Sequence, residues 1–211
     1  MLLSDEMIQN NKEKFIEIVN SITREFNKEY LLETLEGSDF FYAPASTKYH
    51  GAYKGGLCDH CLNVYFNLKS LVEKKHLGDV ISDDSIAIVA LFHDLSKMSF
   101  YEPDVKNKKV YSPTGSKYDQ GGNYDWISVT GYKVREASDR IIYGSHEETS
   151  EFIARNFIPL TQQESVAILH HMGGKGWDSA QDDITVVFNN NPLATLLHVA
   201  DVISTYVDEA I

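Results

Sequence analysis

The apolar residues of this chain recur mainly at intervals of three and four positions, which is the period of an amphipathic α-helix. Over residues 11–36 this pattern predicts one N-terminal helix that packs on the rest of the chain, and Gly37 follows as a stop signal. Its predicted buried stripe consists of Phe15, Ile18, Val19, Ile22 and Phe26. After a loop over residues 38–56, a second stripe predicts a helix that begins near Leu57.

A third helix is expected to be the central one of a helical bundle. Ser82, Asp83 and Asp84 are all suitable N-caps, and the sequence IAIVALFHDL that follows is apolar nearly all round. A histidine and an aspartate at the end of so apolar a helix require an explanation.

Three further helix starts are marked by local sequence signals. Ser145 with Glu148, and Thr161 with Glu164, match the capping box, in which the hydroxyl and the carboxylate each accept a free backbone amide. The pair Asn191-Pro192 supplies an N-cap and first residue for a last helix running through Asp201. The helix after Thr161 is expected to end at Gly173-Gly174.

Residues 99–144 interrupt the helical pattern. Glycine and proline punctuate the segment, while KKVY and YDWISVTGYKV have the β-branched and aromatic character of strands. We expect an insertion, a small irregular segment or β-hairpin, placed over the mouth of a helical site. Seven basic residues against six acidic ones between Tyr101 and Ser145 make this the least acidic part of the chain.

Composition narrows the class of protein. A length of 211 residues suits one domain, and 31 acidic against 19 basic residues give a net charge of -12, which argues against binding long nucleic acids. With no apolar run long enough for a membrane span and no signal-peptide pattern, we expect a cytoplasmic protein that does not bind membranes. Cys58 and Cys61 are expected to be buried, reduced thiols.

Four candidate metal ligands lie in strongly apolar helical stretches. They are His60, the pair His93-Asp94, and Asp201. A buried carboxylate is costly unless it is paired or bound to a cation, and imidazole with carboxylate is the ligand set of divalent metals that activate water. One shared metal would resolve the burial of all of them.

The order of these residues and their surroundings resemble the HD-domain metal-dependent phosphohydrolases. The resemblance is carried by GGLCDHCLNV, by HDLSK after IAIVALF, and by LLHVADVIST, and it spans about residues 50–208. It implies an all-α fold, a single HD-domain helical bundle over residues 1–211 with the insertion at 99–144 near the site. It also implies that the four ligands fall on His60, His93, Asp94 and Asp201.

The resemblance further implies a two-metal site. Members with two ions have two more histidines, which here would be His146 and His171, with His170 as the alternative to His171, and Asp94 would bridge both ions. The sequence leaves open one ion or two, and manganese, magnesium, iron, nickel, cobalt or zinc as the metal.

The expected activity is hydrolysis of a phosphoester, either a phosphomonoester or a phosphodiester. The substrate would be a nucleotide or a similar small phosphorylated molecule. Asp94 is the candidate for orienting the attacking water, and Lys97, one helical turn on, is the candidate for offsetting phosphate charge. His50, Lys97, Arg135 and Arg140 are the candidate substrate contacts, and Tyr118, Tyr124 or Trp126 could stack on a base.

Two other functions are compatible with the same residues. A di-iron enzyme of the HD type would use the ligand set for oxygenation, and a non-catalytic HD domain would use it to bind a ligand. His198 is either a partner of a metal ligand or an ordinary core histidine. The sequence does not fix the oligomeric state and leaves a homodimer open.

Overall fold

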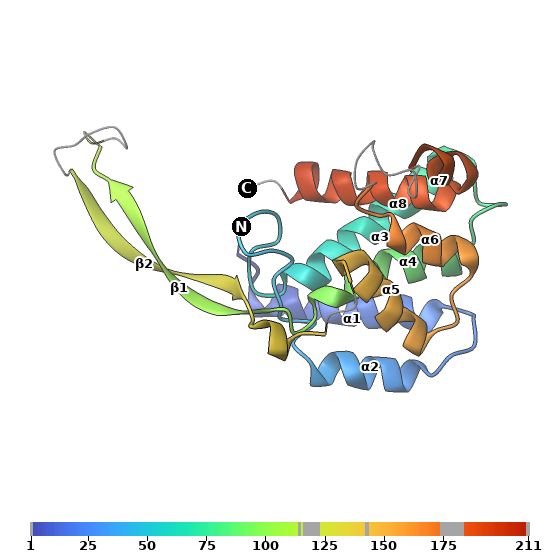
Figure 1. Ribbon diagram of the computed structural model, residues 1–211, viewed down its shortest axis with the longest axis horizontal. Helices are drawn as coiled ribbons and strands as arrows, with labels where there is room; N and C mark the ends of the chain where they lie inside the picture. Colours follow the sequence, from blue (N-terminus) through green and yellow to red (C-terminus); the bar gives the residue numbers. More distant parts are fainter. Residues whose placement is uncertain (1, 114, 116–122, 142–143, 174–183, 210–211) are drawn as a thin grey trace.

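The computed structural model describes residues 2–113, 115, 123–141, 144–173 and 184–209. These residues form a mostly helical body and one two-stranded antiparallel sheet (Figure 1). The helices are α1 (Asp5–Ser21), α2 (Lys28–Gly37), α3 (Gly56–Lys74), α4 (Asp83–Phe92), α5 (His146–Phe157), α6 (Gln162–Leu169), α7 (Ile184–Asn190) and α8 (Pro192–Ile203). In the described ranges, none of them combines the length and apolarity needed to cross a bilayer.

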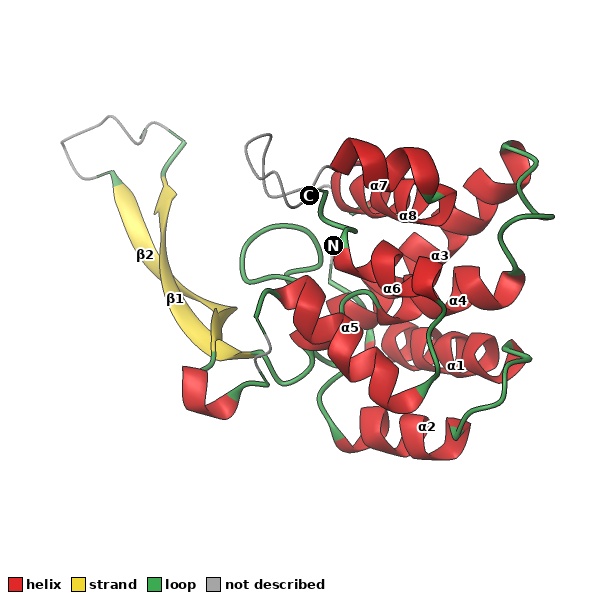
Figure 2. Cartoon of the chain, turned by 45° about the vertical axis from the view of Figure 1, so that its right-hand side comes forward, coloured by secondary structure: helices red, strands yellow, loops and turns green. Residues whose placement is uncertain are grey.

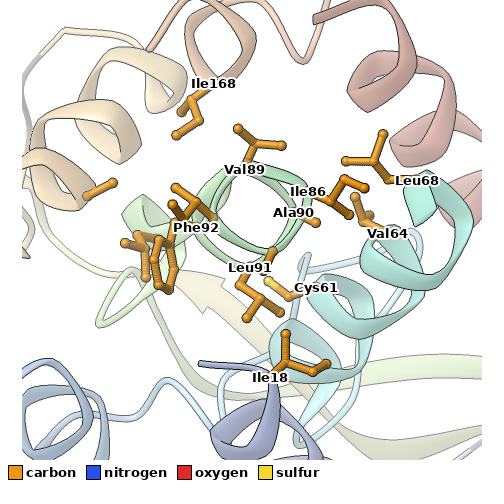
Figure 3. Packing of buried hydrophobic residues seen from close by; sticks show 14 of the residues in the cluster. Ile18, Cys61, Val64, Leu68, Ile86, Val89, Ala90, Leu91, Phe92 and Ile168 are labelled. Carbon is orange, nitrogen blue, oxygen red and sulfur yellow. The ribbon is translucent and has the colours of Figure 1, made fainter. Parts of the chain in front are cut away.

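Helix α4 is the centre of the body, as its all-round apolar sequence predicted. Every residue from Ile86 to Phe92 is buried, and the helix packs against α1, α3, α5, α6 and α8. Figure 3 shows its side chains pointing outward on all sides, toward Ile18 of α1, Leu68 of α3 and Ile168 of α6. A helix so enclosed holds its C-terminal end, and hence the residues that follow it, in a fixed place.

The single helix expected over residues 11–36 is wrong, because the chain forms α1 and α2 with a break between them. The break is stabilised by Asp84 at the start of α4, whose carboxylate accepts hydrogen bonds from the backbone amides of Thr23 and Arg24 at 2.8 and 2.9 Å. Asn27 then caps α2 through the amide of Tyr30. The apolar stripe continues across the break, which explains why its period suggested one helix.

The other helix starts agree with their sequence signals. Ser82 caps α4, Asn191 caps α8, and both predicted capping boxes are present at α5 and α6. Helix α6 ends at Leu169, and Gly173 adopts a left-handed conformation after it, while Gly174 lies outside the described residues. Cys58 and Cys61 are buried free thiols, as expected.

The predicted hairpin is present as β1 (Tyr101–Tyr111) and β2 (Tyr124–Val134), paired in register from Tyr101 opposite Val134 to Tyr111 opposite Tyr124. The two strands project from the helical body as an arm, and none of the helices in the described ranges lies along their length (Figures 1 and 2). The arm begins a few residues after His93 and Asp94, so its base lies close to the end of α4.

Candidate metal centre

Six histidine and aspartate side chains from five helices meet at one end of the body. His93 and Asp94 directly follow α4, His146 is the first residue of α5, and His171 follows α6. His60 lies in the second turn of α3, and Asp201 lies in the last turn of α8. Helix ends thus place these side chains, and the packing of α4 fixes their common centre.

One group of ligand atoms surrounds the Oδ2 atom of Asp94. The Nε2 atoms of His60 and His93 each lie 3.5 Å from this oxygen and 3.3 Å from one another. Asp201 closes the group, with its Oδ1 atom 3.3 Å from Nε2 of His60. All four residues are buried, so the negative charges of Asp94 and Asp201 are largely shielded from water.

A second group surrounds the other carboxylate oxygen of Asp94. The Nε2 atoms of His171 and His146 lie 3.7 and 3.8 Å from Oδ1, and 3.2 Å from one another. Within the described ranges, this buried Oδ1 atom has no hydrogen-bond partner. Asp94 therefore presents one oxygen to each of two groups of nitrogen atoms.

The second ring nitrogen of each histidine faces an acceptor. Nδ1 of His93 lies 2.9 Å from the carbonyl oxygen of Ala90, and Nδ1 of His171 lies 2.7 Å from that of Ile168. Nδ1 of His146 lies 3.3 Å from a carboxylate oxygen of Glu147. Donation from Nδ1 leaves the lone pair of Nε2 directed at the centre, which is how proteins orient histidine as a metal ligand.

The donor set fits a divalent cation. Buried histidine and aspartate atoms lie within 4.8 Å of one another in two overlapping sets, His60 with His93 and Asp201, and His93 with Asp94 and His171. Imidazole and carboxylate together suit zinc, iron, manganese and their neighbours. The lone pairs of several histidine nitrogens point at one centre, and a buried oxygen of Asp94 has no donor among the described residues. Both features cost free energy of folding unless a cation binds there.

The protonation of the centre follows from its burial and its charges. Burial lowers the pKa of His93 to about 3, so this ring is neutral, as a ligand must be. Burial acts in the same direction on His60, but hydrogen bonds with Asp201 and Glu209 outweigh it and raise the pKa of His60 to about 10. Binding of a cation at this position would therefore displace a proton from His60.

Glu209 is a functional candidate that the sequence patterns did not reveal. A π-helical segment, Ser204–Asp208, follows α8 and returns the chain toward α3. Buried Glu209 lies 3.1 Å from Nδ1 of His60 and accepts a hydrogen bond from Asn63 at 3.0 Å. The carboxylate thus orients His60, in the arrangement of carboxylate, histidine and metal common in metalloproteins.

A cavity of about 960 Å³ opens beside the centre. Asp94, His146 and Asp201 line it, together with Lys97 and His50. Lys97 binds Oδ2 of Asp94 at 2.6 Å, and although burial opposes its charge, the attraction of Asp94 raises the pKa of the lysine. Burial lowers the pKa of His50, whose Nε2 atom is buried and, among the described residues, has no hydrogen-bond partner.

Four predicted residues lie elsewhere or act indirectly. Arg135 pairs with Asp39 at 3.4 Å, and the guanidinium of Arg140 lies 4.8 Å from the ring centre of Phe100; neither arginine lines the cavity. His170 contacts the carbonyl oxygen of Val166 and is absent from both groups of ligand atoms in the described part of the chain. His198 lines the cavity and holds the carbonyl oxygen of His171 at 2.7 Å.

In its described part, the insertion contributes Phe100 and Tyr101 to the cavity wall, and its two strands then lead away from the helical body (Figure 1). Tyr101, at the base of β1, is the one residue of the two strands among those that line the cavity. Tyr124 and Trp126 lie far along the arm, and Tyr118 lies outside the described residues (Figure 1).

Comparisons of the chain with protein-family models, with curated proteins and with solved structures found no match. The geometry and chemistry of the centre are therefore the basis for its function.

Proposed function

We propose that this protein is a metal-dependent phosphohydrolase of the HD-domain type, which hydrolyses a phosphoester of a nucleotide or a similar small phosphorylated molecule. The observation that supports it most is the position of Asp94. Its two oxygens face two separate groups of buried histidine nitrogens, and one of these oxygens has no other partner in the described ranges.

The ligands would divide between two ions that share Asp94. His60, His93 and Asp201 would hold the first ion, and His146 and His171 the second. Two ions held in this way supply a water of lowered pKa and positive charge for the phosphate oxygens. His146 is 32% exposed at its side chain and Asp201 is 11% exposed, so the second position is the more open to solvent and substrate.

The chain itself supplies the remaining functions. Asp94 would orient the attacking water, because its carboxylate lies between the two groups of nitrogens at the cavity wall. Lys97 remains protonated at neutral pH and would offset negative charge as it develops on the phosphate. Neutral His50, whose ring centre lies 5.0 Å from that of His60, lines the cavity and would donate a hydrogen bond to a phosphate oxygen.

The cavity supports a small substrate. Its volume of about 960 Å³ lies within the range of pockets for small molecules, roughly 300–1,000 Å³. Tyr49, Phe100 and Tyr101 provide aromatic wall, while Lys48 and Lys97 provide positive charge. Aromatic surface beside cations suits a phosphate attached to a planar group such as a base.

The proposal is tested by phosphate release from a panel of nucleotides and simple phosphoesters, with manganese, magnesium, iron, cobalt, nickel or zinc added in turn. We expect metal-dependent release that is lost in Asp94→Asn and retained in His170→Ala. Failure of every substrate and metal would contradict the proposal. Oxygen consumption by the iron-loaded protein, without phosphate release, would identify an oxygenase instead.

A further inference from the structure

The hairpin arm has two chemically different faces. Because side chains alternate along a strand, the register of the hairpin places five aromatic residues on one face: Tyr101, Tyr111, Tyr124, Trp126 and Tyr132. This aromatic face has no acidic residue and carries Lys109, whose Nζ atom lies 4.2 Å from the ring centre of Tyr124 and 5.1 Å from that of Trp126. The opposite face holds all three acidic residues of the strands, Glu102, Asp104 and Asp125.

The aromatic face is exposed although it is the more apolar one. Val105 and Trp126 are 71% and 60% exposed, and no helix of the described part of the chain covers the arm (Figures 1 and 2). A two-stranded hairpin is only marginally stable in water without a surface to pack against. An arm of this length, with Trp126 exposed among four partly buried tyrosines, therefore indicates a binding partner.

A matching surface exists at the mouth of the cavity. Val199, Val202 and Tyr206, spaced three and four residues apart on α8 and the segment after it, are 36%, 41% and 74% exposed. Met172 and Tyr49, both exposed, lie with Val202 and Tyr206 around the cavity. This apolar rim, defined by Tyr49, Met172, Val199, Val202 and Tyr206, has the character of an interaction site.

We propose that the aromatic face of the arm packs on the apolar rim of a second copy of this chain, so that each copy covers the cavity mouth of the other. Charge favours this partner, because the two strands hold four lysines and three acidic residues, a net charge of +1, whereas the remainder of the chain bears -13, which gives the total of -12. The exposed carboxylate of Asp208 beside Tyr206 is available to Lys109 of the other copy. The same excess of negative charge disfavours a nucleic acid.

The area of the contact is sufficient for a dimer. A ribbon of two 11-residue strands is about 35 Å long and roughly 10 Å wide, so one face offers about 350 Å². In a reciprocal pair each copy contributes one arm face and one receiving surface, which gives about 700 Å² per copy, close to the roughly 800 Å² of standard interfaces. Tyr101, at the base of the aromatic face, lines the cavity, so this face and the mouth begin on the same side of the molecule.

The first test is the oligomeric state of the full chain by sedimentation velocity at 1–100 µM, roughly the range in which interfaces of this size act. We expect a dimer whose dissociation constant rises at least about 10-fold in Trp126→Ser and changes less than about 2-fold in Ile127→Ser. Ile127 is the matched control, since it is the next residue, is 43% exposed and lies on the opposite face. A wild-type monomer throughout this range, or equal effects of both substitutions, would overturn the proposal.

The second test locates the contact. Ser128→Cys protein, with the new thiol at an exposed position of the aromatic face that keeps Trp126, is mixed with Tyr206→Cys protein and treated with a bismaleimide, while the native Cys58 and Cys61 are buried. We expect covalent dimers from this mixture and far fewer when Ile127→Cys, on the opposite face, replaces Ser128→Cys. A dimer that gives no such cross-link would refute the proposal that each copy covers the cavity of the other. If the protein is instead a monomer that binds a single-stranded oligonucleotide, and Trp126→Ser abolishes this binding, the partner of the aromatic face is a nucleic acid and not a second copy.

Discussion

Two buried carboxylates of this protein have opposite surroundings. Glu164 accepts hydrogen bonds from both guanidinium nitrogens of Arg24 at 2.6 and 2.8 Å, from Ser85 at 2.8 Å and from the amide of Thr161 at 2.8 Å. Asp94 is equally buried, but one of its oxygens faces histidine nitrogens without a donor in the described ranges. A buried charge with complete partners stabilises the fold, whereas one with incomplete partners marks a ligand site.

The largest expected effect is on activity and follows removal of the Asp94 charge. Asp94→Asn keeps the size and an acceptor for Lys97 but no longer attracts cations, so we expect activity to fall on the order of 10³-fold. We also expect manganese to raise the Tm of the wild type and not of the variant, because only a native state that binds the ion is stabilised by it. Equal shifts of Tm in both proteins, measured by calorimetry, would contradict this role.

The next effect is on stability and concerns Glu164, the carboxylate whose hydrogen-bond partners are complete. Glu164→Ala leaves Arg24 without its partner, so we expect a loss of about 3 kcal/mol in the free energy of unfolding, with metal content and activity per folded molecule unchanged. Urea unfolding of both proteins measures this difference. A loss of metal in the folded variant would show that the two clusters are not independent.

The stability that Glu164 contributes also depends on pH. Burial opposes its charge, but the hydrogen bond from Arg24 and those from Thr161 and Ser85 hold its pKa below the usual value, about 4.3. A depressed pKa in the folded state means that this stability is present above about pH 4.3 and is lost as the pH falls further. We expect the difference in the free energy of unfolding between the wild type and Glu164→Gln to be constant at pH 6–8 and to shrink below about pH 4.3. A difference that grows in acid would contradict this prediction.

A smaller effect separates the adjacent histidines. His171→Ala removes a ligand nitrogen from the second group, so we expect one ion per chain fewer and a loss of activity of about 100-fold. His170→Ala is the matched control, because in the described part of the chain the side chain of His170 hydrogen-bonds only to Val166 of its own helix. Comparable losses in both variants would contradict the assignment.

The smallest effect concerns Glu209. Glu209→Gln weakens the orientation of His60, and we expect the affinity for metal to fall about 10-fold in a competition assay with a chelator. Asp208→Asn, at the exposed neighbouring residue, is the control and should leave the affinity unchanged. A variant of Glu209 that binds metal as tightly as the wild type would mean that this contact serves the fold alone.

Local signals in the sequence predicted those helices whose ends are set by residues close to them in the chain. The capping boxes at Ser145 and Thr161 located α5 and α6, and the all-round apolar run predicted the central α4. The break between α1 and α2 depends on Asp84, about 60 residues away in sequence, so no local pattern reveals it. Helix α7 was likewise not predicted.

The candidate site was predicted in part for the same reason. His60, His93, Asp94 and Asp201 stood out as polar residues in apolar stretches, and the structure brings them together. Glu209 reaches His60 through a π-helical segment whose path the sequence does not indicate. Arg135 and Arg140 were predicted as substrate contacts from their charge and from the expectation that the insertion overhangs the site. Their positions depend on where the arm leaves the body, which the sequence does not indicate.

The central claim is that the centre around Asp94 binds metal. The most direct test is the metal content of the full chain, purified after expression with the candidate metals present and measured by mass spectrometry of the elements. The account predicts about two ions per chain in the wild type, almost none in Asp94→Ala, and the wild-type value in His170→Ala. A wild-type protein without metal, or an Asp94→Ala protein that retains the wild-type content, would contradict it.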